Sequence, residues 1–103
     1  MDPDDSIRES HRLRDHGANM RGDAIRLQLA TAMTFCGMVE TELKSGHLSD
    51  AKLLVALITR SVQTLSRHID EPHHVPESDK PELHRRLDIL QAELVKAKEL
   101  MAM

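Results

Sequence analysis

The chain has 103 residues, of which 40% are hydrophobic and a single one, Phe35, is aromatic. A chain of this length forms one small domain with a thin core, and here the core must consist of aliphatic side chains. The formal net charge of −3 argues against binding to a nucleic-acid backbone, which needs a basic stripe. We also expect no membrane-spanning helix, because no apolar run reaches about 18 residues.

Residues 1–22 are polar, and we expect an arm that is loosely ordered or forms a short helix ending near Gly17. The acidic start, Met1–Asp5, differs from a basic secretory signal, so the sequence predicts a cytoplasmic protein. Several arginines on and beside the arm are candidates for nucleic-acid contact, but acidic residues lie among them and a solvated polar surface is the simpler interpretation. These arginines are Arg8, Arg12, Arg14, Arg21 and Arg26.

Residues 23–103 contain three stretches in which apolar residues recur at alternating spacings of four and three. This spacing keeps the apolar side chains of each stretch on one face of an α-helix. It predicts three helices, over residues 23–45, 49–70 and 79–101. The positions on these core stripes are Ile25, Leu29, Ala32, Cys36, Val39, Leu43, Ala51, Val55, Ile58, Val62, Leu65, Ile69, Leu83, Leu87, Leu90, Leu94, Ala97 and Met101.

The segments between the stripes carry the signals of helix ends. Gly46 suits the left-handed position that ends a helix, and Ser49 is a candidate N-cap for the second helix. Pro72 ends the second helix, and Asp79 can cap the third. Short connections make sequential helices antiparallel neighbours. We therefore expect an all-α fold, either an up-down-up three-helix bundle or a long helical hairpin with a third helix.

The first two helices carry apolar residues beyond their core stripes, more than one neighbouring helix can cover. Because monomers rarely expose large apolar patches, we expect oligomerisation, as a homodimer, to complete the fold. Met33 and Met38 either fill the core, which is the commoner role of methionine, or form a face for a partner. The candidate interface residues are Leu27, Met33, Phe35, Met38, Leu53 and Leu57.

Residues 35–55 resemble one tetratricopeptide-type helical hairpin. Phe35 stands where that repeat prefers an aromatic residue, and Met38 where it prefers leucine. Gly46 falls in the turn between helices, and Ala51 at the small packing position of the second helix. The resemblance covers about a fifth of the chain, without a second copy. It implies a helix–turn–helix hairpin used for protein contacts.

Four of the seven histidines cluster around the connection between the second and third predicted helices, among acidic residues. Imidazole and carboxylate groups are ligands for zinc and similar metals, so this region is a candidate metal site. Histidine also gains charge between about pH 5 and pH 8, so the cluster could make assembly depend on pH. A solvated polar loop is the simpler interpretation. The four residues are His68, His73, His74 and His84.

The sequence carries no arrangement typical of catalysis. Cys36, the single cysteine, lies on a core stripe, where cysteine usually acts as a small hydrophobic residue. No glycine-rich phosphate loop is present, and we expect neither an enzyme nor a bound cofactor. The sequence therefore predicts a small helical module for protein–protein association. Its expected partner is a second copy of itself, and the same apolar residues would also suit a heteromeric complex. The alternative is a metal-responsive or pH-responsive helical protein that uses the histidine cluster.

Overall fold

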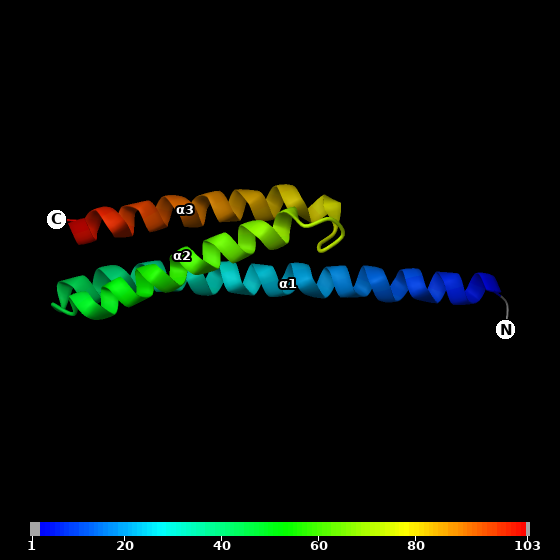
Figure 1. Cartoon of the computed structure of the whole chain (residues 1–103), viewed down its shortest axis with the longest axis horizontal. Helices are drawn as coiled ribbons and strands as arrows, with labels where there is room; N and C mark the ends of the chain where they lie inside the picture. The colour runs from blue at the N-terminus through cyan, green and yellow to red at the C-terminus, as the bar shows by residue number, and fades with distance from the viewer. Residues whose placement is uncertain (1–2, 103) are drawn as a thin grey trace.

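The computed structural model describes residues 3–102, and the side chains of residues 17–102. Over this range the chain is all-helical, which confirms the predicted class. It forms α1 (Pro3–Lys44), α2 (Leu48–Asp70) and α3 (Lys80–Ala102), with the short 3₁₀ turn η1 (Glu77–Asp79) before α3. The chain reverses direction at each connection, so α1 and α3 run the same way and α2 runs opposite to both (Figure 1).

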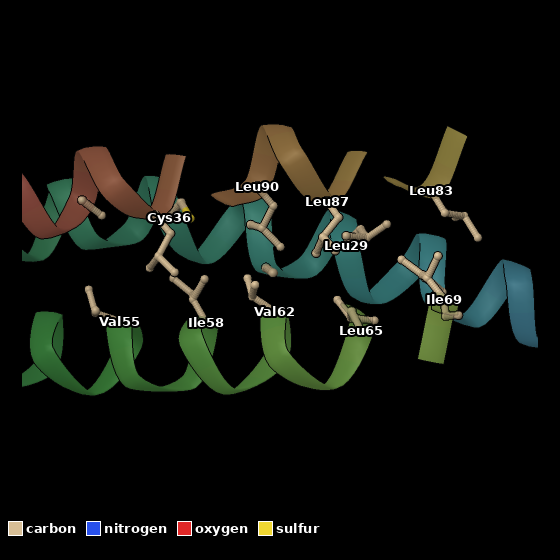
Figure 2. Close-up of a cluster of buried hydrophobic side chains, with 14 of the residues drawn as sticks. Leu29, Cys36, Val55, Ile58, Val62, Leu65, Ile69, Leu83, Leu87 and Leu90 are labelled. Carbon is tan, nitrogen blue, oxygen red and sulfur yellow. The ribbon is translucent and has the colours of Figure 1, made fainter. Parts of the chain in front are cut away.

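The core consists of the predicted stripes. Of the eighteen stripe positions, sixteen are buried, and Leu43 and Met101 are partly buried against the core. Figure 2 shows side chains of α2 such as Ile58 and Leu65 directed at those of α1 and α3, among them Leu29 and Leu87. Each pair of the three helices is in contact. One continuous aliphatic cluster therefore holds all three helices.

The predicted start of the first helix at Asp23 is wrong, because α1 begins at Pro3 and passes through Gly17 and Gly22 without interruption. Glycine in a helix costs only about 1 kcal/mol relative to alanine, which a long helix tolerates. Gly22 is buried, and a Cβ atom added there would lie 3.4 Å from an Asp79 carboxylate oxygen. Gly22 therefore lies in a packed position inside α1, in contact with η1, and does not mark a helix boundary.

α1 is nearly twice as long as α2 or α3, with 42 residues against 23 in each. Its N-terminal part extends past the connection between α2 and α3 (Figure 1). The molecule is consequently elongated, with extents of 66 × 20 × 15 Å. The arm predicted for residues 1–22 is thus helical from Pro3 onward. The described part of the chain excludes Met1, Asp2 and Met103. It also excludes the side chains of residues 1–16, among them those of Arg8, Arg12 and Arg14.

α1 and α2 are joined by a tight turn at Gly46, which has φ +79°. The amide of Gly46 donates to the carbonyl of Leu43, and the amide of His47 donates to that of Glu42. This pair of hydrogen bonds is the Schellman arrangement, which needs a left-handed residue and so favours glycine. The predicted Ser49 cap is wrong, because α2 begins one residue earlier and His47 occupies the N-cap position.

The connection between α2 and α3 folds back onto α1. Val75, which the sequence pattern does not distinguish from the surrounding polar loop, is buried in the core. The guanidinium of Arg21 donates to the backbone carbonyls of His73 and His74. His73 has φ +62°, an uncommon conformation for a residue other than glycine. Contacts with α1 therefore fix the conformation of this loop.

Ile58 is fully buried at the centre of α2, so shortening its side chain should destabilise the fold. We expect Ile58→Ala to lower the free energy of unfolding by about 2–5 kcal/mol, because it removes buried methyl groups and leaves a cavity. Urea denaturation followed by circular dichroism measures this loss. Ile89→Ala on α3 is the matched control: Ile89 is half exposed, and its change should stay within about 0.5 kcal/mol. Equal losses in both variants would contradict the described core.

Candidate interaction surface

One side of the molecule, formed by α1 and α2, carries exposed apolar residues and is termed here the α1–α2 face. On α1 this face consists of residues spaced three or four apart, namely Leu27, Thr31, Phe35 and Met38. Leu53 and Leu57 do the same on α2. Leu27 is 69% exposed and Leu53 61%, while Met38 and Leu57 are each more than two-fifths exposed. Four of the six predicted interface residues are therefore accessible to a partner.

A groove of about 410 Å³ runs between α1 and α2 on this face. Leu27 and Phe35 flank it on α1, and the single charged residue among its lining residues is Arg60. Small side chains line much of the remainder, and the hydroxyl of Thr31 donates to the carbonyl of Leu27, 2.9 Å away. Because that hydroxyl already has its partner, covering Thr31 leaves no unpaired donor. The lining residues are Leu27, Gln28, Thr31, Ala32, Phe35, Arg60, Ser61 and Thr64.

The predicted interface set does not form one patch. Phe35 is partly buried and packs against the core, although it also lines the groove. Met33 packs against the core too, but it lines a second hollow, of about 250 Å³, between α1 and α3. Met33 thus fills space between helices, whereas Met38 is exposed. The sequence pattern did not identify Thr31, Ser61 and Thr64 as part of this surface. Their helical spacing from Leu27 and Leu57 could have placed them on the same face.

The four predicted metal-binding histidines do not converge, and only two of their rings approach each other. The rings of His68 and His74 lie 4.9 Å apart between centroids. His84 Nε2 is 2.7 Å from Asp70 Oδ1, and His73 contributes its backbone carbonyl to Arg21. Over the described residues, these four do not supply three ligand atoms to one point. Zinc binding by this set stays a prediction.

A different trio comes together at the turn between α1 and α2. One potential ligand atom from each of Glu42, His47 and Asp50 lies within 4.8 Å of the others. His47 Nδ1 is 2.8 Å from Glu42 Oε2, which already pairs these two groups. His47 and Asp50 are exposed, and Asp50 lies in the first turn of α2, where the helix dipole favours an anion. The contact between His47 and Glu42 and the position of Asp50 in the first turn of α2 thus account for the trio without a metal.

Arg26 joins the start of α3 to α1. Its guanidinium lies 3.0 Å from Glu82, 3.3 Å from Asp79 and 2.9 Å from Asp23. Hydrogen bonding with Glu82 raises the pKa of Arg26 further above its ordinary value, and the same bond lowers the pKa of Glu82. Arg21 and Arg26, two of the arginines considered for nucleic-acid contact, therefore bind groups within the chain.

Burial gives Cys36 the environment expected of a structural residue. The side chain belongs to the core, and burial, with a smaller effect of Glu93, raises the pKa of its thiol. A raised pKa keeps the thiol protonated at neutral pH, and the thiolate is the reactive form. Cys36 consequently packs as a small hydrophobic residue.

Among the described residues, no helix is both long and apolar enough to cross a membrane. Comparison of the chain with models of protein families, with curated proteins and with solved structures finds no match. The resemblance of residues 35–55 to a tetratricopeptide-type hairpin therefore stays a prediction.

The lowered pKa of Glu82 predicts acid sensitivity. The stabilisation from its ionised form is fully present above the ordinary value of 4.5 and is lost as the pH falls below it. We expect the urea midpoint to fall as the pH drops below 4.5, and to fall less steeply for Glu82→Gln, which is already less stable at pH 7. Glu99→Gln, at an exposed position of α3, is the control. Parallel pH profiles for Glu82→Gln and the unaltered chain would contradict this role.

Proposed function

We propose that the protein is a small, non-enzymatic helical module that associates with other protein through the α1–α2 face, and that its partner is a second copy of itself. The observation that carries this proposal is the groove between α1 and α2, with one charged lining residue and exposed leucines along its helices. Depletion of charge at the centre and apolar side chains in well-packed pockets are typical of protein interfaces.

The thin core supports the same conclusion. All the buried residues are apolar among the described side chains, and their aliphatic cluster leaves no enclosed polar site within that part of the chain. Leu27, Met38, Leu53 and Leu57 add nothing to that core while they remain exposed. Covering each of them would contribute up to roughly 1.5–3 kcal/mol before the cost of association. Completion of the fold by oligomerisation gives these residues a role.

Sedimentation equilibrium of the full chain tests the proposal. We expect a species of twice the 11.6 kDa chain mass, and a monomer for the double variant Leu27→Glu, Leu57→Glu, because two buried charges without partners oppose association. Both positions are exposed, so helicity should be unchanged. Val95→Glu on α3, also exposed, is the matched control and should remain dimeric. A monomer at every concentration of the unaltered chain would contradict self-association.

The second candidate function is a metal-responsive or pH-responsive protein that uses the histidine cluster at the α2–α3 connection. The approach of His68 to His74 favours it, as does the pairing of His84 with Asp70. Isothermal titration with zinc at micromolar protein tests it, with His74→Gln expected to remove any heat. Binding retained by His74→Gln but lost in His47→Gln would instead place the metal at the α1–α2 turn. No heat with the unaltered chain would contradict metal binding.

A further inference from the structure

The exposed side chain of Leu27 lies beside the groove of the α1–α2 face, and its size and polarity suit the same groove on a second copy of the chain. Leu27 is 69% exposed at one end, and the half-buried Phe35 lies at the other, with Thr31 midway between them along α1. The surface therefore offers both an apolar projection and the hollow to receive one. A surface that contains both halves of a contact is self-complementary, which is the property of an interface between two identical chains related by a two-fold axis.

The register of such a pair follows from these positions. Consider two α1 helices that lie antiparallel, with the two-fold axis at Thr31. A residue a given number of positions before Thr31 then faces the residue the same number of positions after Thr31 in the second copy. Leu27 then faces Phe35 of the second copy, and Ala24 faces Met38 of the second copy. The small side chain of Ala24 leaves room for the large side chain of Met38, which allows the two helices to pack closely. Thr31 meets its own copy with its hydroxyl already bonded within the helix.

The dimensions of the face suit a second copy of this hairpin. Residues 20–43 of α1 span about 36 Å, and two adjacent helices are together about 19 Å wide. The footprint is therefore roughly 700 Å², close to the ~800 Å² that each partner buries in a stable interface. Arg60 is the single charge among the groove residues, so two copies meet there without dense like-charge repulsion.

We propose that a second copy of this chain packs its α1 antiparallel along the α1–α2 groove, with Thr31 on the two-fold axis and Leu27 of each copy seated against Phe35 of the other. This proposal rests on the proposed association through the α1–α2 face. It adds the orientation, the register and the residue pairs. A dimer formed through α3 or through the extended part of α1 lacks the Thr31 contact. Parallel α1 helices would keep that contact but would pair Leu27 with Leu27 and Gln28 with Gln28.

Disulfide cross-linking of the full chain tests the register. Thr31→Cys should give a disulfide-linked dimer on mild oxidation, because residues on the axis bring their Cβ atoms to the separation that a disulfide needs. Ala30→Cys is the matched control, since residue 30 is exposed on the same helix but turned by about 100°. We expect at least a tenfold higher cross-linked fraction for Thr31→Cys. We expect the unaltered chain to remain uncrosslinked, because Cys36 is buried in the core.

A mixture of the Gln28→Cys and Thr34→Cys chains gives an independent measurement, because the same register places these two positions opposite each other. A mixed disulfide in excess of either self-pair supports the proposal, whereas an excess of self-pairs indicates parallel α1 helices and contradicts it. If the chain sediments as a dimer but Thr31→Cys cross-links no better than Ala30→Cys, the register is wrong and the association function stands. If the chain sediments as a monomer, both the register and self-association are wrong.

Discussion

The structure depends on burial of one aliphatic strip to which all three helices contribute. Because Phe35 is the single aromatic residue and is only partly buried, the packing comes from leucine, isoleucine, valine and alanine at the centre of the molecule. Each helix presents one stripe to this strip, so the remaining faces are available for other contacts. The exposed apolar residues on the α1–α2 face lie outside the core stripes and are not needed to fill the core. The functional proposal therefore depends on them.

Much of the fold could be predicted from the sequence, because period and burial are linked in an amphipathic helix. The positions from Ile25 to Ala97 show this link in all three helices. The start of α1 could not be predicted in the same way. The polar residues before Asp23 show no apolar stripe, yet α1 continues through them, and Gly22 lies buried beside Asp79, a residue far away in the sequence. Val75 was missed for a similar reason, since an isolated buried residue in a loop has no period.

The candidate surface could be predicted in part. Leu27, Met38, Leu53 and Leu57 were identified because they exceed what one stripe requires, and they are exposed. Met33 carries the same signal, but the packing of α3 beside it gives it a different role. The histidines around the α2–α3 connection were a candidate metal site because they lie close together in the sequence, but only the rings of His68 and His74 approach each other. Arg21 and Arg26 were placed on a solvated surface because their acceptors lie about fifty residues further along the chain.

The long overhang of α1 has a consequence for the behaviour of the molecule in solution. The radius of gyration is 18.2 Å, against about 13 Å for a compact chain of 100 residues. Rotational tumbling about the short axes is slow for such a rod-like particle, and its hydrodynamic radius exceeds that of a sphere of equal mass. A monomer would elute early from a gel-filtration column, at the volume of a larger globular protein. Elution volume alone would therefore imitate a dimer, and only a method independent of shape reports the true mass.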